Sequence, residues 1–130
     1  MRKIIMAAII LLFVASSTYA EAKQENFKDK FKLEQGYWLH LDNIDVWGSP
    51  RNATLQLTMH HDVSDEQILP SGTIFNLYDG AVLIAQGELR TVFSGKDYNI
   101  IDIRNLTQYD KVTGDEILYQ EKIMLGKRVR

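Results

Sequence analysis

Apolar and polar side chains alternate with a period of two along most of the chain after residue 36. This is the period of a β-strand that buries one face and exposes the other. The alternation is clearest over 37–41 and 54–63, and a bulge near Asn43 would carry the first strand on to Trp47. The expected buried faces consist of Tyr37, Leu39 and Leu41 in the first stretch, and of Leu55, Leu57, Met59, His61 and Val63 in the second.

Four more strands are predicted over 73–78, 81–93, 98–106 and 117–125, and residues that favour turns separate them. The run 48–52 is the clearest break in the chain. Asp79-Gly80 readily supplies the positive φ angles of a hairpin turn, and the segments 94–97 and 110–115 each contain a glycine. The sequence therefore predicts successive hairpins with short connections.

Two segments depart from the strand pattern. In 64–69, Ser64 and Gln67 have the spacing of a capping box and Pro70 follows, which predicts a single helical turn. The charged lead-in 21–35 carries Phe27 and Phe31 four residues apart, as on one face of a helix, with Gly36 as the C-cap. Phe27, Phe31 and Leu33 also fit the alternation of a strand, so the pattern is ambiguous. A helical or flexible lead-in that packs loosely on the domain is the interpretation we favour.

These elements predict an all-β fold of six or seven strands within residues 36–125, followed by a basic tail over 126–130. Short connections without intervening long helices favour a small antiparallel β-sandwich, and a small barrel is the alternative. Of the 130 residues, 45% are apolar, which suits one domain with its own core.

The first 20 residues have the features of a secretory signal peptide. Arg2 and Lys3 precede an apolar run over 4–15, and cleavage is expected after Ala20 or Ala22. Such a run spans only about 18 Å as a helix, too short to cross a hydrocarbon core of about 30 Å. We expect no transmembrane segment in the chain that remains.

Charge and cysteine content indicate the kind of partner and the cellular compartment expected for the mature chain. Cleavage after Ala20 removes Arg2 and Lys3 but no acidic residue, so the formal net charge changes from −2 to −4. This acidic balance argues against nucleic-acid binding. The chain has no cysteine, whereas small secreted eukaryotic domains commonly rely on disulfides. We therefore expect a bacterial protein that is periplasmic or secreted.

His40, His60 and Asp62 are the candidate ligands for a divalent metal, because imidazole and carboxylate groups both bind such ions. Adjacent side chains in a strand point to opposite faces, so His60 and His61 would not share one ion. A solvated His60, with His61 at the edge of the core, is the favoured interpretation. No nucleophile elbow, phosphate loop or other catalytic set is present in the sequence, and no cofactor is implied.

The aromatic residues indicate a binding surface more clearly. Trp38 and Tyr78 fall on the polar faces of their predicted strands, and with Trp47 they are the candidate binding residues. We therefore expect a non-catalytic module that binds another protein in the bacterial envelope or outside the cell. The alternatives are a metal- or carbohydrate-binding domain and a structural subunit that self-associates through its edges. The basic tail could contact an anionic partner or a lipid surface.

Overall fold

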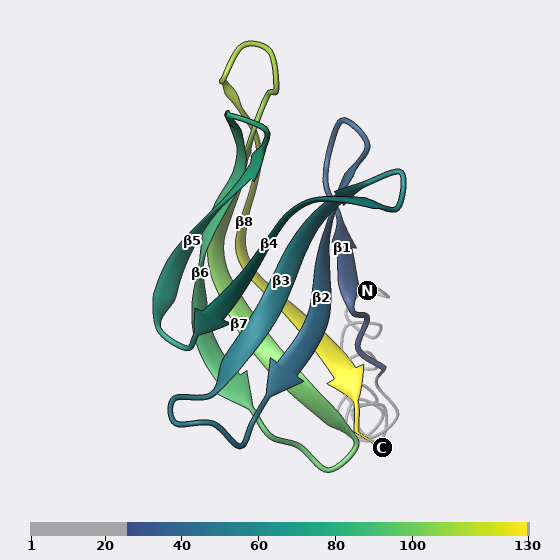
Figure 1. Ribbon diagram of the computed structural model, residues 1–130, viewed down its shortest axis with the longest axis vertical. Coiled ribbons are helices and arrows are strands. Elements are labelled where there is room, and N and C mark those ends of the chain that lie inside the picture. The colour runs from purple at the N-terminus through teal and green to yellow at the C-terminus, as the bar shows by residue number, and fades with distance from the viewer. Residues whose placement is uncertain (1–25, 130) are drawn as a thin grey trace, which may run out of the picture.

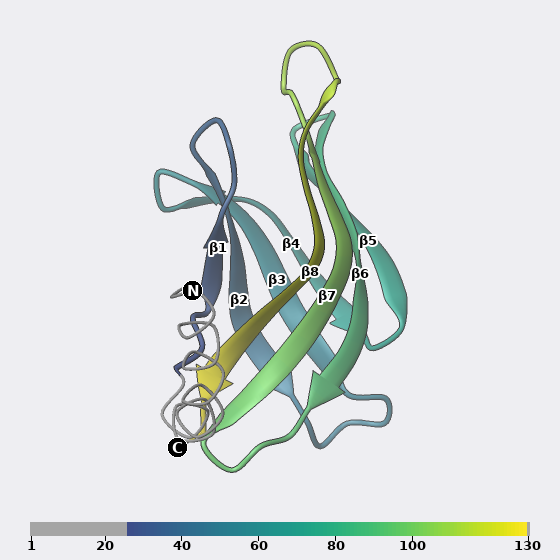
Figure 2. The same cartoon turned by 180° about the vertical axis from the view of Figure 1, so that it is seen from behind.

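The computed structural model describes residues 26–129, and they form two antiparallel sheets packed face to face (Figures 1 and 2). Sheet A has the order β1-β2-β3-β4, and sheet B has the order β5-β6-β7-β8. The expected all-β antiparallel sandwich is confirmed. The strands are β1 (Lys30–Lys32), β2 (Tyr37–Asp45), β3 (Asn52–Met59), β4 (Asp62–Pro70), β5 (Thr73–Asp79), β6 (Val82–Phe93), β7 (Tyr98–Tyr109) and β8 (Glu116–Arg128).

The core lies between the sheets and is built from the alternating apolar positions. Leu39 and Leu41 of β2 and Leu55 and Leu57 of β3 are fully buried in sheet A, as the pattern predicted. Burying each such side chain contributes about 1.5–3 kcal/mol. Sheet B supplies the opposite layer through Phe75, Leu77, Ile84, Leu89, Ile101, Ile103 and Leu106.

Residues 26–129 form eight strands where six or seven were predicted, because β1 and β4 give weak signals. The single helical turn predicted over 64–69 is wrong, since this segment lies inside β4. β4 is mostly exposed and polar, and Leu69 is its buried apolar residue. Hydrogen-bonded pairing with β3, rather than burial of alternate side chains, therefore stabilises it as a strand. β1 has only three residues, too few to show a period.

The helical alternative for the lead-in is also wrong within the residues described. Gly36, with φ 85°, lies in the turn between β1 and β2 and does not cap a helix. Residues 21–25 of the lead-in lie outside the described residues, as do the predicted signal peptide over 1–20 and Arg130. A basic tail was predicted over 126–130. Residues 126–128 are not a tail, because they belong to β8.

Most of the predicted turns are confirmed. The register of β2 shifts between Leu41 and Asn43, as expected for a bulge there. The hairpin at Asp79-Gly80 joins β5 to β6, and the segments 94–97 and 110–115 join β6 to β7 and β7 to β8. The strand predicted over 54–63 is too long, however, because β3 ends at Met59 and a new strand begins at Asp62.

A strap formed by residues 26–29 joins the two sheets at one side. The backbone carbonyl of Asp29 accepts a hydrogen bond from Leu41 N–H in sheet A, with an N···O distance of 2.7 Å. The carbonyl of Lys28 accepts one from Gly126 N–H in sheet B at 3.0 Å. A Cβ atom at Gly126 would lie 2.8 Å from the Cβ of Phe27, so the strap needs glycine there. The described residues include no helix with the length and apolar character that a membrane crossing requires.

Candidate functional site

A groove of about 530 Å³ lies on sheet A and collects side chains that are far apart in the sequence. Such a volume falls within the range of small-molecule sites. β1, β2 and β3 provide most of the lining, and the β1–β2 turn, the β3–β4 turn and β4 provide the rest. The lining residues are Lys30, Gly36, Trp38, His40, Gln56, Thr58, His60, His61 and Val63.

The strand register explains why the residues on the groove floor meet. Leu39 and Leu57 are paired and buried, so their neighbours on each strand project from the opposite, outer face. His40 pairs with Gln56, and Trp38 pairs with Thr58. The period-two pattern that fills the core thus also places these four side chains together outside it.

The wall of the groove is a strained turn. His60 and His61 have φ angles of 52° and 71°, and together they form the two-residue connection between β3 and β4. Two consecutive positive φ angles are typical of a type I′ hairpin turn, which usually contains Asn and Gly. The left-handed region costs an ordinary residue about 1–2 kcal/mol. Two histidines therefore occupy positions where other residues would be more stable.

This turn corrects the sequence interpretation of the histidine pair. The argument that His60 and His61 point to opposite faces assumed a continuous strand. In the turn both side chains are exposed, and both line the same groove. His61 is therefore not at the edge of the core.

Hydrogen bonds hold the floor of the groove in place. Gln56 Nε2 donates to Glu66 Oε1 at 2.7 Å, which directs the Oε1 atom of Gln56 toward His40 Nδ1 at 3.0 Å. Because an amide oxygen only accepts, Nδ1 of His40 carries the proton. His40 Nε2 lies 3.5 Å from Asp29 Oδ2 in the strap. The imidazole is thus oriented by Gln56 at Nδ1, and its Nε2 edge lies beside the strap.

Trp38 forms the aromatic part of the floor and is half-buried. The Lys30 ammonium group lies 5.5 Å from the centroid of the Trp38 ring, a cation–π arrangement. The lining residues include no acidic side chain, while lysine and imidazole groups are present. The groove is therefore chemically suited to a polar or acidic ligand.

The structure brings together some of the predicted site residues and separates others. Trp38, His40 and His60 line the groove, whereas Asp62, Trp47 and Tyr78 are not part of its lining. Trp47 is 91% exposed in the β2–β3 loop, and Tyr78 is partly exposed on β5. Within residues 26–129, no group of three or more His, Asp or Glu side chains is placed to hold a metal ion.

Sequence reasoning missed Lys30, Gln56 and Thr58 as lining residues. Gln56 and Thr58 stand on the polar face of a predicted strand, so alternation placed them outside the core without indicating a site. Their outward direction, combined with the β2–β3 register, is the signal that identifies them. Lys30 belongs to β1, where alternation was only one of the possible interpretations of the sequence.

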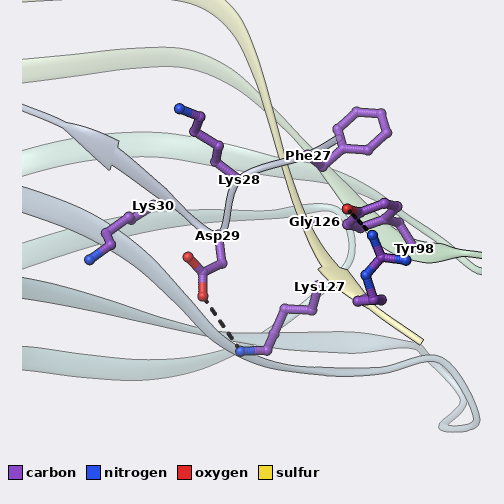
Figure 3. Close-up of a pocket in the computed structure, with 8 residues that line it drawn as sticks. Phe27, Lys28, Asp29, Lys30, Tyr98, Gly126 and Lys127 are labelled. Carbon is purple, nitrogen blue, oxygen red and sulfur yellow. Dashed lines mark hydrogen bonds and ion pairs between the residues drawn. The ribbon is translucent and has the colours of Figure 1, made fainter. Parts of the chain in front are cut away.

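A second hollow lies at the strap and is rich in cations (Figure 3). Arg128 donates a hydrogen bond to the Tyr98 hydroxyl at 3.0 Å, and its guanidinium lies 4.8 Å from the centroid of that ring. Lys127 Nζ is 3.7 Å from Asp29 Oδ2. The hollow is lined by Phe27, Lys28, Asp29, Lys30, Tyr98, Gly126, Lys127 and Arg128.

The comparisons with protein families, with curated proteins and with solved structures found no match to this chain.

Proposed function

We propose that this chain is an exported, non-catalytic module of the bacterial envelope or extracellular space, and that its groove on sheet A binds another protein. The ligand would be a polar, acidic segment of that partner. The supporting observation is the groove itself, where an aromatic floor, amide and hydroxyl groups and two turn histidines converge on one face.

The strained turn supports this proposal. Residues held in sparsely populated backbone conformations cluster at functional sites. His60 and His61 sit at such positions, and both line the groove. A role in binding would explain why the two histidines occupy these positions although they lower the stability of the fold.

The preference for an acidic partner follows from the charges of the lining. Lys30 and the imidazoles can donate hydrogen bonds or carry positive charge, and the cation over Trp38 occupies space above its ring. A carboxylate could pair with these donors. A sugar would need an uncovered ring face.

The test is site-specific photocrosslinking in cells that export the protein. A photoreactive residue at Thr58, on the groove floor, is compared with one at Thr107, which is equally half-buried on β7 of sheet B. We expect a discrete adduct with a partner protein from position 58 only. The adduct should disappear in Trp38→Ala and persist in Trp47→Ala.

Three results would contradict the proposal. Equal adducts from both positions would show non-specific proximity, and loss of the adduct in both tryptophan variants would mean that the groove is not the contact. A stoichiometric metal ion in tag-free protein that is lost in His60→Ala would assign the groove to metal binding instead.

A further inference from the structure

Trp47 is displayed at one end of the sandwich, away from the groove. Its side chain is 91% exposed, the highest value among the exposed large hydrophobic residues described. The β2–β3 loop that carries it lies at the same end of the long axis as the β6–β7 loop and the end of β8 (Figures 1 and 2). Phe93 and Val129, at the borders of those segments, are 42% and 39% exposed.

The loop around Trp47 is built to hold its shape. The Asp45 carboxylate accepts hydrogen bonds from the backbone N–H groups of Trp47 at 2.9 Å and Gly48 at 3.1 Å. Arg51 donates to the Val92 carbonyl at 3.2 Å, which ties the loop to sheet B. The loop backbone that carries the exposed indole is therefore held in place by hydrogen bonds.

The segments at and near this end of the molecule carry several cations, although the chain as a whole is acidic. Lys28, Lys127 and Arg128 line the hollow at the strap, where Figure 3 shows Lys127 directed toward Asp29 and Lys28 directed away from it. The loops add Arg51 and Lys96. The carboxylates of the same segments are Asp29, Asp45 and Asp97, of which Asp29 faces Lys127 and Asp45 is occupied by the loop backbone.

We propose that this end of the sandwich docks on an anionic lipid surface, with Trp47 at the interface and the surrounding cations near the headgroups. Indole rings are favoured at the boundary between headgroups and acyl chains. Basic residues near an anionic leaflet each strengthen attachment.

A lipid surface fits this end better than a protein partner does. Protein interfaces bury a continuous patch with an apolar centre. Here the exposed apolar side chains are single residues on separate loops and strand ends, and the same segments carry cations. Such isolated protruding residues can enter a fluid interface independently.

The first test is flotation of residues 21–130 with vesicles. This chain contains all the described residues, and the core residues all lie between Leu33 and Leu125. We expect binding to phosphatidylcholine vesicles that contain phosphatidylglycerol, and much weaker binding to phosphatidylcholine alone or at high salt. Trp47→Ala should lower the partition coefficient roughly tenfold or more. Arg128→Gln should lower it about fivefold.

Trp38→Ala is the matched control, because it removes the other tryptophan of the chain and lies in the groove. It should leave vesicle binding unchanged. No binding to the anionic vesicles, or equal losses in the two tryptophan variants, would overturn the proposal. Neither result bears on protein binding at the groove, because that binding is tested separately by crosslinking from Thr58.

A second measurement reports on insertion itself. In Trp38→Phe, Trp47 is the only remaining tryptophan, so the fluorescence comes from the proposed contact. Its emission should shift to shorter wavelength when phosphatidylglycerol vesicles are added. An unshifted spectrum with bound protein would exclude Trp47 as the inserted residue.

Discussion

Tyr37 connects the two sheets through one hydrogen bond, and removing its hydroxyl tests whether that bond stabilises the sandwich. The ring is fully buried, and its hydroxyl donates to Asp79 Oδ2 at 2.6 Å. Burial, followed by the interaction with Asp79, raises the pKa of Tyr37 above its ordinary value, so the hydroxyl keeps its proton. The variant Tyr37→Phe preserves the ring and removes only the donor.

The expected loss follows from the kind of bond. Hydrogen bonds to charged groups contribute about 1.5–3 kcal/mol. The lower end applies here, because the Asp79 side chain is 30% exposed and keeps Lys111 at 3.4 Å. We expect Tyr37→Phe to lower the free energy of unfolding by about 1.5 kcal/mol. For a domain of this size, the melting temperature should fall by about 6 °C.

The loss should depend on pH. The hydrogen bond from Tyr37 lowers the pKa of Asp79, and Lys111 contributes in the same direction. A lowered pKa in the folded state adds stability above the ordinary value of about 4, and this stability disappears as pH falls through the folded pKa. The difference between wild type and Tyr37→Phe should therefore be constant near neutral pH and shrink in acid.

The assay is urea unfolding followed by circular dichroism at neutral and acidic pH. Tyr109→Phe is the matched control, since its hydroxyl donates to the neutral Gln86 amide at 3.0 Å and not to a carboxylate. Its effect should be about 1 kcal/mol and independent of pH. A Tyr37→Phe effect that stays equal in acid, or an unchanged stability at neutral pH, would refute the reasoning.

Three further predictions concern backbone geometry. Replacing His60 by Asn and His61 by Gly should raise the free energy of unfolding by about 1 kcal/mol, because both residues have positive φ; a melting temperature at or below wild type would contradict this. Gly87→Ala should destabilise by about 1–3 kcal/mol in urea, because its Cβ would lie 2.8 Å from the Phe75 ring; an unchanged midpoint would mean that the ring moves freely. Gly126→Ala should displace the strap, and faster hydrogen exchange at Leu41, whose N–H donates to the strap, is the sign to look for. Normal exchange there would show that the strap accommodates the added methyl group.

The local pattern was enough to predict the sandwich and the strands that fill its core. Leu39, Leu41, Leu55 and Leu57 alternate with polar residues and are buried, because a strand has a period of two wherever it lies. The turn at Asp79-Gly80 was predictable for a similar reason, since backbone preference acts within a few residues.

The groove was only partly predictable. Trp38 and His40 could be placed on an outer face, but their meeting with Gln56 and with the histidine turn depends on how strands pair. The alternation continues through 60–63, so it predicted that β3 extends past Met59. In the structure, the hairpin turn at His60 and His61 ends the strand there. Register and turn position depend on contacts between segments, which a local period does not contain.

Composition and alternation by themselves thus determined an antiparallel β-domain with a buried apolar layer. The tertiary structure decided that a polar segment becomes β4, that the strap crosses from one sheet to the other, and that two histidines face one groove. The physical reason is that hydrophobic burial selects which face of a strand is hidden, whereas hydrogen bonds between distant segments select its neighbours.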